Sequence, residues 1–379
     1  MLVIIGTGLA GYQLAKEIRK RDSSQSMMLI TADSGDYYSK PELSTALAKG
    51  KNATSLVMTS AKAMAEQLGA DILTHSRVVS VDATLRTIQL KNNKKIAYDK
   101  LVLACGADTI CPSIKGNAAE DVLSVNHLHH YALFHESIQD KKTIVILGAG
   151  LIGCEFANDL SAAGFKVHVI ALAKTPLDLL LPSDIGLLLQ AALEKQGVQF
   201  HFECTLSEIN KHGGGYQLTL SNGATLVSDG VLSAIGLKPH LDLAHSAHLK
   251  TNKGIVVNAY LETSDPHIYA LGDCAEVEGR VLPYVAPILH AARALASTLT
   301  GARAKVDYPP MPIVVKTPAF PLIVCPPLPN VKGGWMIESV EDNTRALFYN
   351  DQKELQGFVL TGELVKERMM RVKQLASSI

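Results

Sequence analysis

Two stretches of the chain decide its fold: LVIIGTGLAG at residues 2–11 and TIVILGAGLIGCEFANDLSAAG at residues 143–164. Each begins with an apolar run of strand type, passes through glycines spaced G-x-G-x-x-G, and continues with the spacing of a helix. The glycines are Gly6, Gly8 and Gly11 in the first stretch, and Gly148, Gly150 and Gly153 in the second. The chain therefore carries two copies of one strand–turn–helix unit.

Each glycine in such a turn has a separate physical role. The first makes a tight turn, the second lets the backbone approach a pyrophosphate, and the third lets the helix pack closely on the strand. The pyrophosphate then lies at the helix N-terminus, against free N–H groups and the positive end of the helix dipole. Glycines that serve only the turns are the alternative, but two complete units predict two bound dinucleotides.

The repeat continues beyond the glycines. In the first half a hairpin turns at Asn92-Asn93, and a buried strand then ends in Ala104-Cys105-Gly106. In the second half the hairpin turns at Asn222-Gly223, a strong turn signal, and the strand ends in Ala234-Ile235-Gly236. Duplication of a parallel Rossmann core with an inserted antiparallel ribbon explains both halves.

A third motif, TSDPHIYALGDCAEV at residues 263–277, delivers Gly272-Asp273 at the end of a short strand. It resembles the second flavin motif of the FAD-dependent pyridine-nucleotide reductases, in which the aspartate hydrogen-bonds the ribityl chain of FAD. Thr263, Ile268, Tyr269 and Ala270 match that motif together with Gly272-Asp273. A helix N-cap is the alternative role for Asp273.

This resemblance covers nearly the whole chain and implies an α/β fold with two Rossmann-like dinucleotide-binding domains, each with an inserted antiparallel ribbon, plus a small α+β C-terminal domain. The implied FAD domain is discontinuous, at residues 1–110 and 235–305. The NAD(P)H domain would span 111–234. The tail, 306–379, alternates apolar and polar residues before a charged helix, like the C-terminal interface domain of the family.

The resemblance also assigns contacts with FAD. Leu9 and Ala10 belong to the first glycine turn with Gly6, Gly8 and Gly11. Asp33, about 20 residues beyond that turn, is expected at the adenosine ribose with Ser34 beside it; a surface turn is the alternative. Val78 would contact the adenine through its backbone. Val285 opens a helix aimed at the flavin, and Lys316 is either a flavin contact, an interface residue or a lysine that reaches solvent.

Two further residues are expected beside the reacting rings. In the family, a glutamate at the position of Glu155 faces the gap between nicotinamide and flavin. Many ferredoxin reductases place a lysine where this chain has Thr45, so Lys40 in YYSKP is the cation expected to pair with Glu155. Such a pair would orient the rings and tune the flavin; a solvated surface pair is the alternative.

The nucleotide preference of the second unit is left open by the sequence. A ribose-binding glutamate would be expected near Ala171, where none is present. No arginine stands there either, and Lys174 is the cation nearby. NADH is favoured over NADPH because a 2′-phosphate usually requires a bidentate arginine.

Composition narrows the possible partners. Lys plus Arg and Asp plus Glu both number 36, a balance that argues against nucleic acid or an anionic membrane as the main partner. The N-terminus lacks the features of a signal peptide, which predicts a cytoplasmic protein. The six cysteines form no C-x-x-C pair and no metal cluster with histidine, so we expect mostly buried thiols and no metal.

The stretch YYSKPELSTALAKG, residues 37–50, contains no cysteine, and its part PELSTALAKG is expected to form a helix. A disulfide reductase needs a cysteine pair in this region, and a thiol-dependent NADH oxidase or peroxidase needs a single redox cysteine there. The sequence therefore argues against both classes of enzyme. Within the family, YSKPELST, VVKTPAFPL and LQGFVLTG most resemble the rubredoxin reductases, which implies electron flow from NADH through FAD to rubredoxin, an acidic iron protein, and onward to an alkane hydroxylase. A ferredoxin or flavorubredoxin reductase, an NADH oxidase and a non-enzymatic FAD-binding module are the alternatives.

Overall fold

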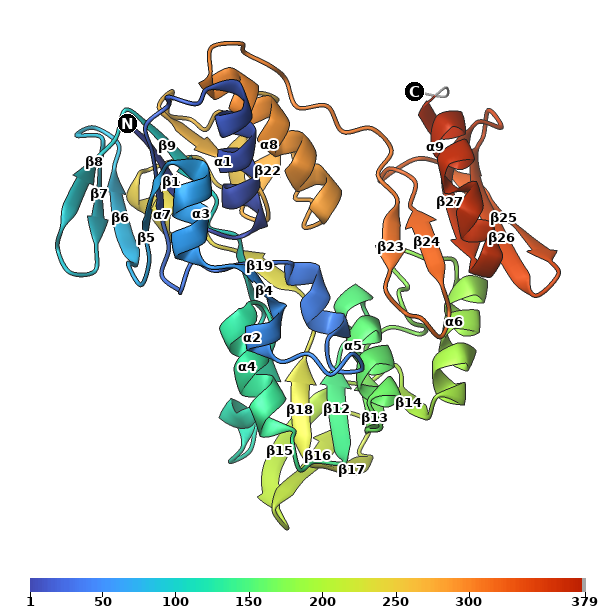
Figure 1. The fold of residues 1–379 in the computed structure, drawn as a ribbon. Helices are drawn as coiled ribbons and strands as arrows, with labels where there is room; N and C mark the ends of the chain where they lie inside the picture. Colours follow the sequence, from blue (N-terminus) through green and yellow to red (C-terminus); the bar gives the residue numbers. More distant parts are fainter. Residues whose placement is uncertain (377–379) are drawn as a thin grey trace. The chain divides into compact units, whose positions relative to one another are not determined.

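The computed structural model describes residues 1–376, which fold into two compact units (Figure 1). Unit 1 contains residues 1–40, 54–108 and 237–308. Unit 2 contains residues 41–53, 109–236 and the described residues from 309 onward, so it unites the predicted NAD(P)H segment, the tail and a short piece of the first half.

Unit 1 is built on a parallel sheet in the order β21-β9-β1-β2-β5. Strand β1 is buried throughout, and β9 is buried at every residue after Lys100, as expected for a parallel sheet covered on both faces. Helices α1 and α8 lie side by side, and α3 also packs against α1 (Figure 1). The elements are β1 (Leu2–Ile5), β2 (Met27–Ile30), β5 (Asp71–Leu73), β9 (Lys100–Leu103), β21 (Ile268–Ala270), α1 (Leu9–Arg21), α3 (Ala61–Leu68) and α8 (Val285–Leu299).

The predicted ribbon of unit 1 is the antiparallel sheet β6-β7-β8, and it turns at the predicted asparagines. Asn93 has a left-handed backbone with φ 66°, and the Asn92 side chain accepts the N–H of Lys94. The remaining elements of this unit are β3 (Tyr37–Tyr38), α2 (Ala53–Leu56), β4 (Val57–Thr59), β6 (Val78–Asp82), β7 (Thr87–Leu90), β8 (Lys95–Ala97), β10 (Ala107–Thr109), β19 (Leu237–Pro239), α7 (Asp242–Ser246), β20 (Ile255–Val257) and β22 (Ala275–Val277), of which α2 and β10 extend to residues at its boundaries.

Unit 2 repeats the plan with a parallel sheet in the order β11-β18-β12-β13-β14 and the ribbon β15-β16-β17. Its hairpin turns at Gly223, with φ 85°. The elements are η2 (Ala119–Asp121), β11 (Leu123–Ser124), α4 (Leu128–Ser137), β12 (Thr143–Leu147), α5 (Leu151–Ala162), β13 (Lys166–Ile170), α6 (Ser183–Lys195), β14 (Val198–His201), β15 (Leu206–His212), β16 (Gly215–Leu220), β17 (Thr225–Ser228) and β18 (Gly230–Ser233). The order β9-β1-β2-β5 in unit 1 matches β18-β12-β13-β14 in unit 2, and these four equivalent strands confirm the predicted pair of Rossmann-like α/β units.

The tail forms an antiparallel sheet in the order β23-β24-β27-β26-β25, with α9 packed on β27. Val315, Leu322 and Val359 of this sheet belong to the same apolar core as Ile144 and Ile146 of β12. This shared core explains why the tail and the second Rossmann segment form one unit. The elements are β23 (Ile313–Val315), β24 (Leu322–Cys325), β25 (Gly333–Val340), β26 (Asn343–Asn350), β27 (Leu355–Thr361), η3 (Gly362–Glu367) and α9 (Arg368–Ala376).

One local prediction was wrong in extent. The sequence PELSTALAKG was expected to form a helix, but the structure has only a short 3₁₀-helix, η1 (Lys40–Thr45), followed by turns. Pro41 lies in its first turn, and a 3₁₀ segment of this kind rarely extends beyond one or two turns.

Candidate active site

The first glycine turn joins β1 to α1 and leaves room for a ligand at one position. A Cβ at Gly6, where φ is 114°, would lie 2.2 Å from the carbonyl oxygen of Ala104, and one at Gly11 would lie 1.9 Å from the oxygen of Gly6. A Cβ at Gly8 would meet no heavy atom within 4 Å. Gly6 and Gly11 therefore serve the turn and the packing, while Gly8 borders open space.

The N-terminus of α1 at this turn suits an anion. Gly8 is the N-cap residue and supplies no side-chain cap, and the first turn contains no acidic residue. The first N–H groups of a helix have no partner within the helix, and the dipole places positive charge there. Together with the open space at Gly8, this arrangement fits the pyrophosphate of a dinucleotide.

The third motif meets the first at this turn. A Cβ at Gly272 would lie 2.8 Å from the Cβ of Ala10, so the chain beyond β21 passes directly over the start of α1. The next residue, Asp273, carries a carboxylate whose Oδ2 lies 3.6 Å from the Nζ of Lys40. No helix starts at Asp273 among the described residues, because β22 follows it. The N-cap alternative for Asp273 is therefore wrong.

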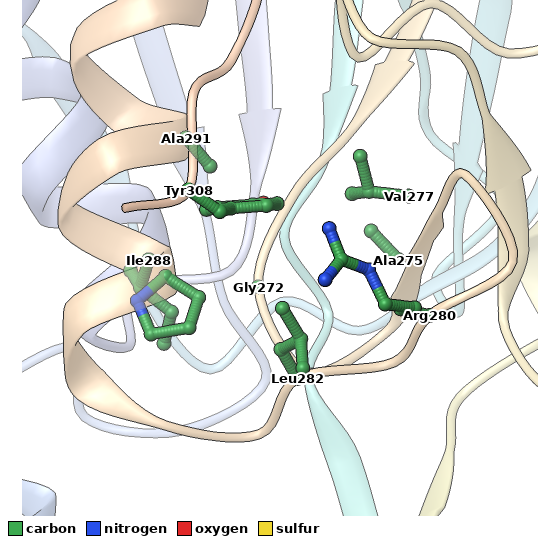
Figure 2. Close-up of a pocket in the computed structure, with 9 residues that line it drawn as sticks. Gly272, Ala275, Val277, Arg280, Leu282, Ile288, Ala291 and Tyr308 are labelled. Atoms are coloured by element: carbon green, nitrogen blue, oxygen red, sulfur yellow. The ribbon is translucent and has the colours of Figure 1, made fainter. Parts of the chain in front are cut away.

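A small pocket lies between β22 and the start of α8 (Figure 2). Ile288 and Ala291 of α8 line one side, and Gly272 adjoins the pocket. Helix α8 begins at Val285, as predicted, and its N-cap residue Tyr284 makes no side-chain cap. The full lining consists of Gly272, Ala275, Val277, Arg280, Leu282, Pro287, Ile288, Ala291 and Tyr308. The N-terminus of α8, like that of α1, thus has no side-chain cap and lies beside the Gly272-Asp273 motif.

Asp33 lies just beyond the end of β2, and a turn fixes its carboxylate. Its Oδ1 accepts the hydroxyl of Thr31 at 2.7 Å and the N–H of Gly35 at 2.9 Å. Asp33 and Ser34 are both exposed at this sheet edge, and Val78 opens β6. The turn role and the predicted ribose role are compatible, because the turn holds the carboxylate at the ligand-binding edge of a parallel sheet.

The second glycine turn, between β12 and α5, repeats the first. A Cβ at Gly148, where φ is 103°, would lie 2.6 Å from the carbonyl oxygen of Ala234, and one at Gly153 would lie 2.0 Å from the oxygen of Gly148. Gly150 borders open space, caps α5 without a side chain, and precedes a first turn with no acid. This turn fits a second pyrophosphate for the same reasons.

Glu155, in the second turn of α5, is 1% exposed and belongs to a compact polar cluster. Lys316, directly after β23, donates its backbone N–H to Oε1 at 3.1 Å and its ammonium to Oε2 at 2.5 Å. Ser44 of η1 donates its hydroxyl to Oε2 at 2.5 Å and accepts from the Lys316 ammonium at 3.0 Å. The ammonium also donates to the carbonyl of Pro41.

This cluster corrects the predicted pairing of Glu155. The cation on Glu155 is Lys316, whereas Lys40 pairs with Asp273. The physical reason is the division of the chain: Lys40 ends the first segment of unit 1, and the segment from Pro41 packs within unit 2. The sequence left three roles open for Lys316. In the structure its ammonium pairs with Glu155, the role that was expected of a lysine at the position of Thr45.

Asp159, one turn further along α5, holds the segment after η1 in place. Its carboxylate accepts the backbone N–H groups of Leu47 at 2.8 Å and Ala48 at 3.1 Å. Burial raises the pKa of Asp159 despite these hydrogen bonds. Asp159 and Ser44 were not predicted from the sequence. The available signal for Asp159 was an acidic residue on a largely buried helix, and for Ser44 it was a hydroxyl in the segment that lacks cysteine.

The thiol next to Glu155 is not a redox group. Cys154 is fully buried and donates to the carbonyl of Ala149 at 3.3 Å, and burial raises the pKa of its thiol. A protonated, inaccessible thiol is inert. All six cysteines are free, and only Cys111 is exposed.

Within residues 1–376 no helix is both long and apolar enough to cross a membrane. The same residues contain no group of three or more His, Cys, Asp or Glu side chains that could hold a metal ion.

Comparison with known families agrees with this geometry. The family described as Pyridine nucleotide-disulphide oxidoreductase matches residues 1–296, which include both glycine turns and Asp273. The chain belongs to this family. It is therefore an oxidoreductase, and the family, whose members use FAD and a pyridine nucleotide, confirms those two predicted cofactors. A second family, described as Rubredoxin binding C-terminal domain, matches residues 305–375.

Similar proteins extend over the full chain. A rubredoxin-NAD(+) reductase of Alcanivorax borkumensis is 48% identical, over 99% of this chain and 98% of that protein. A second one, from Acinetobacter baylyi, is 43% identical over 100% and 98%. A nitric oxide reductase FlRd-NAD(+) reductase of Aeromonas hydrophila is 39% identical over 99% and 96%.

Solved structures share the fold. A ferredoxin reductase from Rhodopseudomonas palustris superposes with a TM-score of 0.89 at 29% identity, over 98% of this chain and 93% of that one. The NADH:rubredoxin oxidoreductase from Clostridium acetobutylicum has a TM-score of 0.82 at 23% identity, over 99% and 94%, which supports the fold alone.

Proposed function

We propose that this protein takes electrons from NADH on FAD and passes them to rubredoxin. The observation that carries the proposal is the combination, in one chain, of a complete reductase region at residues 1–296 with a rubredoxin-binding region at residues 305–375. Relatives named rubredoxin-NAD(+) reductase, at 48% and 43% identity, support the same acceptor.

We assign FAD to unit 1, where the turn at Gly8, the Asp273–Lys40 pair and the start of α8 lie together, and we assign the nicotinamide nucleotide to the turn at Gly150 in unit 2. FAD, when bound, accepts a hydride equivalent from the nicotinamide and releases electrons singly. The protein positions the cofactors with helix N-termini and backbone. We propose that the FAD contacts include Asp33, Ser34, Val78 and Val285.

The absence of cysteine from η1 and the turns after it supports a protein acceptor. Residues 37–50 contain no thiol that could take electrons from the flavin, and the thiol of Cys154 is buried. Electrons on the flavin therefore have no disulfide or peroxide-reducing thiol to reach in this segment. This reasoning favours direct transfer to an electron-transfer protein over a disulfide reductase.

A second candidate acceptor is a flavorubredoxin. The relative from Aeromonas hydrophila, at 39% identity, is named a nitric oxide reductase FlRd-NAD(+) reductase, and its similarity also covers the full chain. Supply of an alkane hydroxylase, an NADH preference and a cytoplasmic location are further parts of our proposal, and each depends on the identity of the acceptor and the nucleotide.

Stopped-flow spectroscopy of the purified, FAD-loaded protein tests the proposal. NADH should bleach the flavin absorbance, and a second mix with oxidised rubredoxin should restore it faster than ferredoxin, flavorubredoxin or a disulfide substrate does. Faster reoxidation by flavorubredoxin would favour the second candidate. Reduction by NADH without reoxidation by any carrier protein would contradict both.

A further inference from the structure

The two halves of the chain can be compared residue by residue at the carboxyl ends of their sheets. In unit 1, Ile30 of β2 pairs with Leu73 of β5, and in unit 2, Ile170 of β13 pairs with His201 of β14. Counting forward from these pairs, Ala173 takes the place of Asp33, and Glu203 takes the place of His75.

Backbone hydrogen bonds support this equivalence. The N–H of His75 donates to the carbonyl of Asp33 at 2.8 Å, and the N–H of Glu203 donates to the carbonyl of Ala173 at 3.2 Å. Both donors have a left-handed backbone, with φ 49° at His75 and 55° at Glu203. Both units therefore contain the same turn. In unit 2 this turn places the backbone of Glu203 next to Ala173, the position that corresponds to Asp33.

The acidic residue at this sheet edge follows a different strand in each unit. Unit 1 carries it on Asp33, at the end of the second strand, whereas unit 2 has alanine both at Ala171, where the acid was expected, and at Ala173. Glu203, at the end of the neighbouring strand, supplies a carboxylate at the same sheet edge. In a doubly wound sheet, dinucleotides bind at the carboxyl ends of the strands, with an acid on the adenosine ribose.

Glu203 is available to a ligand. Its side chain is 67% exposed, and its Oε1 lies 4.0 Å from the ammonium of Lys174, which is 84% exposed. An exposed pair at this distance is weak, so little is lost when the carboxylate turns to another donor. Lys174 is a point charge without the bidentate geometry of arginine, which makes it a poor sole anchor for a 2′-phosphate.

We propose that Glu203 is the specificity residue for the nicotinamide nucleotide: it accepts a hydrogen bond from the adenosine ribose of NADH and repels the 2′-phosphate of NADPH. This proposal rests on the assignment of the nucleotide to unit 2. It names the source of the NADH preference, which the sequence alone leaves open because no acid stands at Ala171.

Isothermal titration calorimetry with adenosine diphosphoribose and its 2′-phosphate tests the proposal without turnover. The FAD-loaded wild type should bind the unphosphorylated fragment at least about tenfold more tightly. Glu203→Gln should reduce that ratio at least about tenfold, by weakening the first fragment and strengthening the second. Glu66→Gln, an exposed glutamate of α3 in unit 1, should leave the ratio unchanged.

Steady-state kinetics should show the same shift. The ratio of kcat/KM for NADH to that for NADPH should fall in Glu203→Gln through KM, with kcat for NADH kept. The proposal would be overturned if the ratio of the two fragment affinities were unchanged in Glu203→Gln. It would also be overturned if the wild type bound the phosphorylated fragment more tightly and this preference disappeared in Lys174→Gln, which would make Lys174 the specificity residue. A folded wild type that binds neither fragment would instead overturn the assignment of the nucleotide to unit 2.

Discussion

Lys316 binds both carboxylate oxygens of Glu155, one through its backbone N–H at 3.1 Å and the other through its ammonium at 2.5 Å. One residue thereby joins the helix after the second glycine turn to a strand segment within the region that matches the rubredoxin-binding family, residues 305–375. Ser44 closes the cluster from η1. Three segments far apart in sequence thus meet at one buried carboxylate.

Removing the ammonium should destabilise unit 2. In Lys316→Gln the carboxylate of Glu155, which is 1% exposed, loses its cation but keeps the backbone N–H donor. We expect the free energy of unfolding to fall by about 3 kcal/mol, the lower end for a buried pair that loses one partner, because Lys316 is itself partly exposed. Urea denaturation of the FAD-loaded protein measures this change.

Two control variants separate the ion pair from side-chain size. Lys316→Gln combined with Glu155→Gln should recover much of the loss, because no unpaired charge then remains buried. Lys40→Gln breaks a longer, partly exposed contact with Asp273, at 3.6 Å, and should cost less than about 1 kcal/mol. An equal loss of stability in Lys40→Gln and Lys316→Gln would contradict the assignment of Lys316 as the partner of Glu155.

Ser44→Ala should have a smaller effect of the same kind. The substitution removes a hydroxyl that donates to Glu155 and accepts from Lys316, and a hydrogen bond to a charged group contributes about 1.5–3 kcal/mol. Thr45→Ala is the matched control, because the Thr45 hydroxyl reaches only the carbonyl of Glu42 at 3.4 Å. Equal unfolding midpoints for the two variants would show that Ser44 makes no net contribution.

Substitution of the middle glycine in each turn should weaken cofactor binding without destabilising the fold. A Cβ at Gly8 or Gly150 enters open space, so Gly8→Ala and Gly150→Ala should change the free energy of unfolding of the cofactor-free protein by less than about 1 kcal/mol. Gly8→Ala should lose FAD on purification. Gly150→Ala should retain flavin absorbance but bind the nicotinamide nucleotide more weakly.

Gly6→Ala is the contrasting variant for that prediction. Its Cβ would lie 2.2 Å from a backbone oxygen at a φ of 114°, and the strain should cost about 2 kcal/mol or more. Full retention of FAD by Gly8→Ala would argue against a pyrophosphate at the start of α1.

The fold was predictable because its signals are local. A strand followed by G-x-G-x-x-G and a helix specifies its own geometry, and the structure places Gly6, Gly11, Gly148 and Gly153 against backbone atoms as that geometry requires. The hairpin turns at Asn93 and Gly223 are local in the same sense. Both were found from the identity of two or three adjacent residues.

The partner of Glu155 was not predictable by such means. Lys316 lies 161 residues away in the chain, and its position depends on how β23 packs on the second Rossmann core. Lys40 was chosen because Thr45 stands where many ferredoxin reductases have a lysine. Side-chain pairs between distant segments depend on tertiary packing, which one sequence without coordinates does not reveal.

A histidine pair predicts how stability changes with pH. His168 of β13 and His201 of β14 lie with Nδ1 and Nε2 3.0 Å apart. Burial lowers the pKa of both, and the charges of His201 and Lys166 lower that of His168 further. Between the lowered pKa values and the ordinary value of about 6.5, the unfolded chain binds more protons than the folded protein.

The stabilisation from these neutral rings is therefore complete above about pH 6.5 and is lost as the pH falls below that value. The free energy of unfolding of the wild type should decrease between about pH 7.5 and about pH 5.5, and His168→Gln with His201→Gln should flatten this decrease. Asp159, whose pKa burial raises, acts in the opposite direction but is common to both proteins. His212→Gln, at an exposed residue of β15, should behave as the wild type. An equal decrease in the double variant and the wild type would show that the pair does not control acid stability.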